Sequence, residues 1–364
     1  MVRPMIDPVI EIDPAIDTVT IAARPDTCYW GYLDPAQPPI LAVDSGTELS
    51  IEAVTHHAGD APDLMMDDGI AAIWSGIPES TRSPGVHIMT GPIHVRGAVP
   101  GGTLRVDLLS MNPRLPYGSN CAAHWGLLYD RFGKERITIY ELAGAAGRDF
   151  GPTARPVFGF DFTERALYDL PGVVSPAGST DRQPFGRSVD VPVRPHLGVM
   201  GVAPADPGRV SSIPPGSFGG NVDNWRFGPG ASVYYPVFQE GAGFYVGDPH
   251  FAQGDGEICG TAIEASLDVH LRLTALDGPA IETPVLETAT HWFTHGFGGD
   301  LDAAMRMAAE TMLKLLVDRV GFTADEAYSL ASVAIDLGVT QVVDGTLGCH
   351  AAVAKSIVGN LLGP

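Results

Sequence analysis

The amino-acid sequence predicts a mainly β protein with an α+β C-terminal region. Glycine and proline are abundant, at 44 and 31 of 364 residues, so turns must be frequent and strands short. Apolar and polar residues alternate in several segments before residue 275, as they do in half-buried strands. After about Gly299 the apolar residues recur with the spacing of a helix.

Strands are expected wherever this alternation is clear, and loops where proline and glycine gather. The stretch 119–195 looks irregular apart from short strands, and 194–220 is dense enough in proline and glycine to be mostly loop. The expected strands are 18–21, 47–54, 136–140 and 269–274. In addition, residues 91–109 are expected to form a strand, a Pro-Gly-Gly turn and a second strand.

The C-terminal part carries helix-capping signals. Asp300 is expected to cap a helix that continues through Val320. Residues 323–326, Thr-Ala-Asp-Glu, form a capping box for a second helix that ends near Leu337. The remaining elements expected are a short strand over 340–343 and a third, apolar helix over 347–362.

Composition limits the classes of function. The net charge of −21 and the absence of a basic stripe disfavour nucleic acid and anionic membranes as partners. No apolar run reaches the roughly 18 residues of a membrane span, and no early basic and apolar stretch marks a signal peptide. None of the 4 cysteines forms a Cys-x-x-Cys pair, so a cytoplasmic protein with free thiols is expected.

The segment Tyr234–Asp268 is the richest in chemically active side chains. Asp248 and His250 are two residues apart, as are Asp255 and Glu257, so on strands each pair would face one cavity. Histidine with carboxylates suits Zn²⁺ or another divalent ion, or acid–base chemistry. Asp255 alone is explained equally well by a Gly-Asp-Gly hairpin turn. Glu264 follows in the same segment.

His56 and His57 follow the end of the strand predicted over 47–54. Because neighbouring residues of a strand face opposite ways, at most one of them is expected to join a given site.

Common amide-hydrolysing machinery is missing from the sequence. There is no Gly-x-Ser-x-Gly nucleophile elbow. The chain holds only three lysines, which argues against Ser-Ser-Lys and Cys-Glu-Lys hydrolases. Cys121 is a conceivable nucleophile, but Lys134, its nearest lysine, lies in a charged turn.

A series of short segments, informative as an ordered set, covers most of residues 40–275. They are 90–104, 194–204, 219–223, 236–237 leading to 247–250, 253–257, and Glu264. In this order they resemble the acetamidase/formamidase family. The sequence departs from the family pattern at Val99, Val222 and Ala242-Gly243, and the last of these lies near the expected pocket.

The resemblance implies hydrolysis of a short-chain amide, such as formamide or acetamide, to a carboxylic acid and ammonia. The enzyme would be a hydrolase of carbon–nitrogen bonds other than peptide bonds. The resemblance also implies a β-sandwich, jelly-roll-like body, a small β-barrel element, an α+β C-terminal region and a homo-oligomer. On this basis we expect a β-rich region over 1–195, a β-rich region with the site motifs over 196–298, and the α+β region over 299–364.

The same resemblance suggests roles for the motif residues. A divalent metal ion, with zinc the first choice, would be held by Asp223, Asp248 and His250, with His56 as a further ligand. Glu264 would be a ligand or the general base that handles the proton as water attacks the amide carbon. Asp255 and Glu257 are the alternatives for that proton transfer.

Two other hypotheses stay open. One is an amide hydrolase of the same fold that uses carboxylates and Cys121 or Cys259 without metal. The other is a cupin-like protein that binds a small molecule or metal without turnover, although the sequence has no His-x-His pair.

Overall fold

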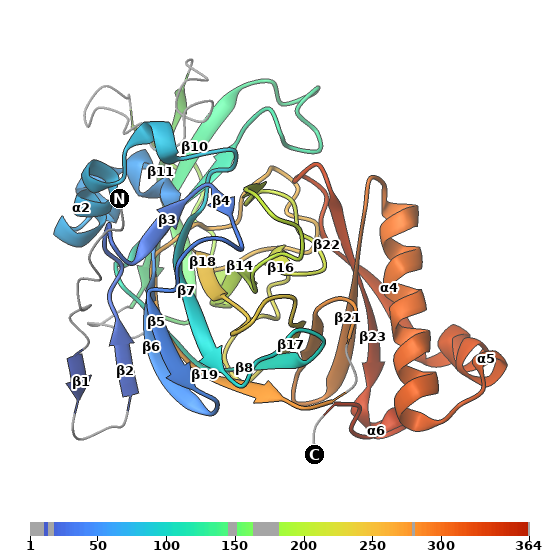
Figure 1. The fold of residues 1–364 in the computed structure, drawn as a ribbon. Helices are drawn as coiled ribbons and strands as arrows, with labels where there is room; N and C mark the ends of the chain where they lie inside the picture. The colour runs from blue at the N-terminus through green and yellow to red at the C-terminus, as the bar shows by residue number, and fades with distance from the viewer. Residues whose placement is uncertain (1–10, 14–17, 145–150, 163–181, 279–280, 363–364) are drawn as a thin grey trace.

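Most of the regular structure is β-strand in a computed structural model that describes residues 11–13, 18–144, 151–162, 182–278 and 281–362 (Figure 1). The predicted mainly β class is therefore confirmed. Among these described residues no sheet closes on itself, so the small barrel implied by the family resemblance is not seen there.

One sheet of 10 strands extends through all three predicted regions of the chain. Its alternating pattern is clearest in β19, where Val269, Leu271 and Leu273 are fully buried and the residues between them are partly exposed. In spatial order the strands are β1 (Glu11–Asp13), β2 (Thr18–Ile21), β6 (Thr47–Ala53), β19 (Leu267–Leu276), β8 (Thr103–Pro113), β17 (Ser232–Pro236), β20 (Val285–Glu287), β21 (His291–Gly298), β23 (Leu347–Ala354) and β22 (Ile335–Gln341).

A second sheet carries the strands that position the site. Its order is β16 (Gly219–Asn221), β14 (His196–Gly201), β18 (Phe244–His250), β7 (Ile88–Arg96) and β3 (Cys28–Trp30), with β5 (Leu41–Asp44) also paired to β7. Leu197 and Val246 of this sheet join Leu49 and Ile51 of the large sheet in one hydrophobic core. The two sheets thus form the expected sandwich.

Two expectations from the sequence concern this sheet. The stretch 194–220 is mostly loop, as expected, but it also contains the strand β14, whose six residues are all buried. Both strands predicted over 91–109 are present, as β7 and β8. They do not pair with each other: β7 lies in this sheet and β8 in the large one, so the turn between them connects the two layers.

A smaller sheet and short helices cover one end of the sandwich. Ile70, Ile73 and Trp74 of α2 pack against this sheet through Ile137 and Ile139. The elements are α1 (Pro62–Met65), α2 (Asp68–Gly76), β9 (Tyr117–Ala122), β10 (Glu135–Ala143), β11 (Thr153–Phe162), β12 (Gln183–Pro184) and β13 (Val191–Pro192), with the 3₁₀ turns η1 (His56–Asp60) and η2 (Glu79–Thr81) and the strand pair β4 (Tyr32–Leu33) and β15 (Val210–Ser211) nearby.

The C-terminal region is α+β, as predicted. Asp300 caps α4 (Leu301–Leu315), which continues into the π-helical turn η3 (Leu316–Val320), and Thr323 with Glu326 forms the predicted capping box of α5 (Ala324–Ala334). The helix α4 lies along β21 and β23 (Figure 1).

The prediction of a helix over 347–362 is wrong. Most of this segment is the strand β23, followed by the short helix α6 (Lys355–Val358). A strand buried on both faces has an unbroken apolar run, which cannot be told from a buried helix by period alone. The second helix also ends earlier than predicted, since β22 begins at Ile335. No helix in the described part of the chain is long and apolar enough to cross a membrane.

Candidate active site

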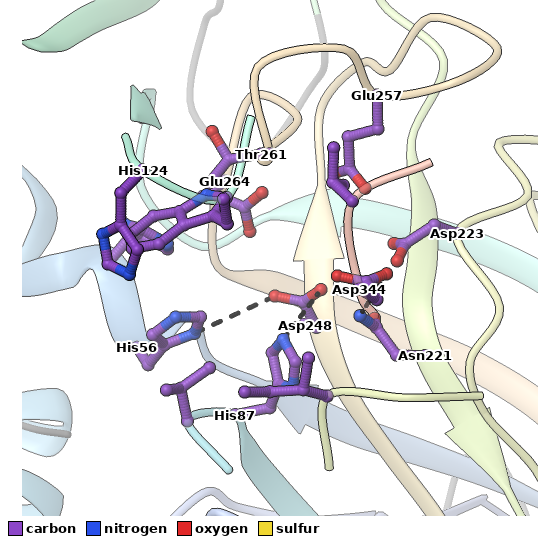
Figure 2. Close-up of a pocket in the computed structure, with 16 residues that line it drawn as sticks. His56, His87, His124, Asn221, Asp223, Asp248, Glu257, Thr261, Glu264 and Asp344 are labelled. Atoms are coloured by element: carbon purple, nitrogen blue, oxygen red, sulfur yellow. Dashed lines mark hydrogen bonds and ion pairs between the residues drawn. The ribbon is translucent and has the colours of Figure 1, made fainter. Parts of the chain in front are cut away.

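A cavity of about 260 Å³ lies where β16 and β18 end (Figure 2). Its polar lining consists mainly of acids and histidines, and among the residues that the structure describes no lysine or arginine lines it. The acids are Asp223, Asp248, Glu257, Glu264 and Asp344, and the histidines are His56, His57, His87 and His124.

Three of these acids have an unusual backbone conformation. Asp223, Asp248 and Glu257 have φ of 50°, 49° and 47°, in the left-handed region that side chains other than glycine rarely adopt. Each such residue costs on the order of 1–3 kcal/mol, and this strain persists where the surrounding structure enforces it, often at functional sites. The backbone thus directs three carboxylates into one cavity at a cost in stability.

Gly198 makes room for two of these acids. It lies between Leu197, which pairs with Pro249, and Val199, which pairs with Gly247, so it is opposite Asp248. A Cβ atom at Gly198 would lie 2.6 Å from Asp223 Oδ1, from Asp248 Oδ2 and from His250 Cε1. Only glycine permits this close approach.

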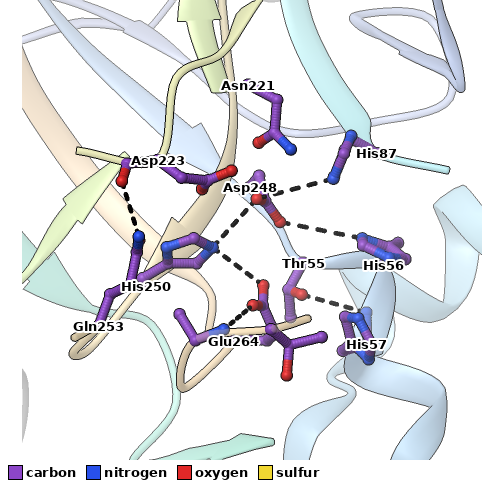
Figure 3. Close-up of polar contacts among 12 residues, drawn as sticks. Thr55, His56, His57, His87, Asn221, Asp223, Asp248, His250, Gln253 and Glu264 are labelled. Carbon is purple, nitrogen blue, oxygen red and sulfur yellow. Dashed lines mark hydrogen bonds and ion pairs between the residues drawn. The ribbon is translucent and has the colours of Figure 1, made fainter. Parts of the chain in front are cut away.

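His250 links Asp248 to Glu264 behind the cavity (Figure 3). Its Nε2 lies 3.0 Å from Asp248 Oδ2 and 3.1 Å from Glu264 Oε2. Burial alone would lower the pKa of His250, but the carboxylates of Glu264 and Asp248 outweigh it and raise that pKa well above its usual value. On the other side of the ring, His250 Nδ1 lies 3.1 Å from His196 Nε2, and His196 Nδ1 donates to the Arg194 carbonyl at 2.7 Å.

The histidine end of the cavity is defined by His56 and His87, which face Asp248 from the opposite side (Figure 3). His87 Nε2 is 3.7 Å from Asp248 Oδ2, and His56 Nδ1 is 4.0 Å from Asp248 Oδ1. These distances exceed a hydrogen bond. They are close to the spacing of roughly 3.5 Å that ligands about 2.1 Å from one zinc ion have from each other. Burial lowers the pKa of both histidines, which favours the neutral form that binds metals.

The carboxylate end is defined by Asp223, Glu257, Asp344 and Asn221. Asn221 donates its Nδ2–H to Asp344 Oδ2 at 3.1 Å, and Asp223 lies close enough to Asp344 to raise its pKa. Burial raises the pKa of Asp223 to about 7 and the pKa values of Glu257 and Asp344 well above their usual range.

The cavity brings together most of the predicted site residues. His56, Asp223, Asp248, Glu257 and Glu264 line it. His250 lies directly behind Asp248 and Glu264. The i, i+2 argument holds for Asp248 and His250, which share the strand β18.

Asp255 is not brought to the cavity. Its side chain is 47% exposed and accepts hydrogen bonds from Trp225 Nε1 at 2.8 Å and Arg226 Nη1 at 3.0 Å. The i, i+2 argument fails for Asp255 and Glu257 because they lie in a loop in which Glu257 has a left-handed backbone, not on a strand. His56 and His57 both line the cavity for a similar reason: they belong to the turn η1, not to a strand.

Sequence reasoning missed several residues of the cavity, among them His87, His124 and Asp344. His87 precedes β7, and its Nδ1 lies 3.0 Å from Ser212 Oγ, which orients the ring. Asp344 lies in the turn between β22 and β23. The Asp-Gly pair at 344–345 signals a turn, but nothing local connects that turn to β18.

The donor atoms of the cavity fit a metal ion. Asp248 Oδ1, Asp223 Oδ1 and His56 Nδ1 are buried and, within the described chain, have no hydrogen-bond partner. Unpaired buried polar atoms are costly, and a cation would satisfy them. The groups whose ligand atoms lie within 4.8 Å of one another are His56, His87 and Asp248; Asp223, His250 and Glu257; and Asp248, His250 and Glu264.

Comparison with known proteins shows which family the chain resembles. The model of the acetamidase/formamidase family matches residues 208–357. The acetamidase of Mycolicibacterium smegmatis is 32% identical over 226 residues, which are 51% of this chain and 53% of that protein. The formamidase of Methylophilus methylotrophus is 27% identical over 372 residues, covering 86% of this chain and 85% of that protein. These matches support the acetamidase/formamidase family for this chain.

A solved member has the same fold. The crystal structure of an acetamidase from Bacillus halodurans superposes with a TM-score of 0.73 at 24% identity, covering 94% of this chain and all of that one. The match to the mycobacterial acetamidase spans about half of that protein's length. The segment matched by the acetamidase/formamidase model contains the whole carboxylate end, whereas His56 and His87 precede it.

His295 supports the loop that carries Asp223. Asn224, the next residue, donates its Nδ2–H to His295 Nε2 at 3.0 Å, and His295 Nδ1 donates to the Pro284 carbonyl at 2.9 Å. Burial, with a smaller contribution from the nearby His350 and Arg226, lowers the pKa of His295 to about 3.

We expect His295 to make the protein less stable in acid. The pKa is about 3 when folded and about 6.5 when unfolded. Between these values the unfolded state binds one more proton, so the free energy of unfolding falls by about 1.4 kcal/mol per pH unit as the pH decreases. Urea unfolding measures the difference in free energy of unfolding between the unaltered protein and His295→Gln. This difference should become smaller as the pH falls from about 6.5 to about 5. A difference that does not change with pH would contradict this assignment.

Proposed function

We propose that the protein hydrolyses a short-chain amide to a carboxylic acid and ammonia. The observation that carries the proposal is the buried Glu264 carboxylate in a small cavity beside a metal-binding set of histidines and Asp248. The relatives named acetamidase and formamidase support the same reaction. The protein would then be a hydrolase of carbon–nitrogen bonds other than peptide bonds.

The lining of the cavity suits a small neutral amide. Val86, Ile213, Val343 and Trp125 contribute apolar surface for an acyl group, and Thr261 contributes a hydroxyl. Trp125 packs so tightly on Gly260 that a Cβ atom there would lie 1.7 Å from Trp125 Cδ1. This contact fixes the aromatic wall relative to the loop that carries Glu257.

Glu264 is the candidate for proton transfer. The Ala262 N–H donates to its Oε1 at 2.8 Å, which fixes the carboxylate, while Oε2 lies toward His250. A water oxygen forms a bond to the amide carbon as one of its protons passes to Glu264. The carbon–nitrogen bond then breaks as Glu264 returns that proton to the nitrogen, which leaves as ammonia. Glu257 is the alternative, at the carboxylate end of the cavity.

The residues that would hold a divalent ion such as zinc are His56, His87 and Asp248. When bound, such an ion polarises a carbonyl group and lowers the pKa of water. Of the other two expected ligands, Asp223 and His250 form a group with Glu257, and His250 also forms a group with Asp248 and Glu264. Ser212 holds the ring of His87 in place from its other nitrogen.

Removing metal from the purified protein should abolish ammonia release from formamide and acetamide, because Asp248 and the two histidines alone offer no Lewis acid. Adding back zinc should restore it. The measurement is an ammonia assay beside elemental analysis of the same samples. Full activity in a verified metal-free sample would remove the metal from the proposal and leave the carboxylate mechanism.

The alternatives have separate tests. Cys121 is fully buried, and neither it nor Cys259 lines the cavity, so a thiol reagent should leave activity unchanged if the proposal is right. A cupin-like binding protein would bind metal tightly yet release no ammonia from any amide of a small panel. We also propose a homo-oligomeric, cytoplasmic enzyme without nucleic-acid or membrane partners, which size-exclusion chromatography and cell fractionation can check.

A further inference from the structure

The two ends of the cavity hold different groups of possible ligands, and Asp248, His250 and Glu264 form a third group between them. Asp223, Glu257 and His250 form a group of possible ligands that shares no residue with the group of His56, His87 and Asp248. Figure 2 shows Asp223, Asp344 and Asn221 on one side of Asp248 and His56 on the other. One ion at the histidine end therefore leaves the carboxylate end unsatisfied.

The carboxylates at this end outnumber the nearby positive charge of His250, which already pairs with Asp248 and Glu264. Asp223 and Glu257 are 1% and 7% exposed, and the cavity lining within the described residues offers them no lysine or arginine. Asp223 Oδ1 is buried and has no hydrogen-bond partner in that part of the chain. Bringing several carboxylates together out of water is strongly unfavourable unless protons or a cation compensate the charge.

A neutral oxygen ligand is present as well. Asn221 is 3% exposed, and its Nδ2–H is used by Asp344, while its Oδ1 has no hydrogen-bond partner among the described residues. Asn221 therefore presents a free carbonyl oxygen beside the carboxylates. Carboxylates with an amide oxygen are the donor set of hard divalent cations.

Independent elements hold these ligands in place. Gln253 Nε2 donates to the Asp223 carbonyl at 2.7 Å, which fixes the loop after β16. The Gly256 N–H donates to the Thr340 carbonyl at 2.9 Å, so the loop that carries Glu257 is attached to β22, which leads to Asp344. The strained backbone of Asp223 and Glu257 is thus maintained by contacts outside the ligands themselves.

We propose that the carboxylate end is a second cation site, which takes a hard divalent cation such as Mn²⁺ or Ca²⁺ through Asp223, Glu257, Asp344 and Asn221. The site is distinct in chemistry from the histidine end, which prefers zinc. It compensates the buried acids, and it goes beyond the single ion of the proposed function.

The test measures cations bound per full-length chain, with Mn²⁺ and Zn²⁺ as probes. The protein is first stripped of metal and then incubated with both probes. Elemental analysis should then find one of each ion per chain. Electron paramagnetic resonance should show that Mn²⁺ binds to a single class of tight sites. Glu257→Gln and Asp344→Asn should each weaken Mn²⁺ binding by about 10-fold to 100-fold and leave zinc bound. His87→Ala should weaken zinc binding and leave Mn²⁺ bound. Asp255→Asn, outside the cavity, should change neither.

The results separate this inference from the proposed function. One zinc per chain, no Mn²⁺ beside it, and full ammonia release would overturn the second site and leave the proposed hydrolysis standing. Mn²⁺ binding that survives both Glu257→Gln and Asp344→Asn in folded protein would also overturn it. Two ions per chain with no ammonia release would support the second site and contradict the hydrolysis.

Discussion

Replacing Asp248 by asparagine is expected to reduce kcat/KM for amide hydrolysis by about 10³-fold or more, equivalent to about 4 kcal/mol of transition-state stabilisation. Asp248 faces His56 and His87 on one side and His250 on the other. Asparagine keeps the shape but removes the charge that a cation and the buried His250 require. Zinc binding at the histidine end should fall in parallel.

The control for this variant is Asp255→Asn. Both residues belong to the segment that the sequence marks as the site, but Asp255 is exposed and pairs with Arg226. Its kcat/KM should stay within about 2-fold of the unaltered enzyme, because surface ion pairs contribute little. Equal activity of Asp248→Asn and Asp255→Asn, with circular dichroism showing both folded, would mean that the chemistry lies elsewhere.

Adding one methyl group at Gly198 should be nearly as damaging. The Cβ of alanine would lie 2.6 Å from Asp223 Oδ1 and Asp248 Oδ2, so both carboxylates must move. A displacement of roughly 1 Å in a catalytic group costs about 10²-fold in rate, and we expect Gly198→Ala to lose at least that in kcat. Overpacking should also lower the free energy of unfolding by about 1–3 kcal/mol.

Gly254→Ala is the matched control. No atom lies within 4 Å of the Cβ position at Gly254, and this glycine also lies close in sequence to a site residue, Glu257. It should leave kcat and the melting temperature nearly unchanged. Steady-state ammonia assays give kcat and thermal unfolding gives the melting temperature of both variants. A fully active Gly198→Ala enzyme would show that Asp223 and Asp248 can move without loss of function.

The fold was predictable where a strand has one buried and one exposed face. Alternation located β2, β6, β10 and β19. It failed for β14 and β23, because strands buried on both faces do not alternate. At β14 the density of glycine and proline indicated a loop, and at β23 an apolar run indicated a helix. Both errors arise from tertiary burial, which a local pattern does not contain.

The site was predictable where its residues share one strand. Asp248 and His250 are two apart on β18, so their spacing indicated a common cavity. Family resemblance added Asp223. His87 and Asp344 come from segments far from β18 in sequence and meet it only through the packing of two sheets and the turn after β22. The left-handed backbone of Glu257, which separates it from Asp255, is likewise set by tertiary contacts.

The position of Asp344 in the turn after β22 has a consequence for biosynthesis. At roughly 5–20 residues per second, the ribosome adds Asp344 on the order of tens of seconds after His87. A nascent chain that lacks β22 and β23 holds the two histidines and Asp248 but not the last wall of the cavity. Hydrolytic activity should therefore emerge only after translation has passed this turn, and ribosome-bound chains stalled before it should be inactive.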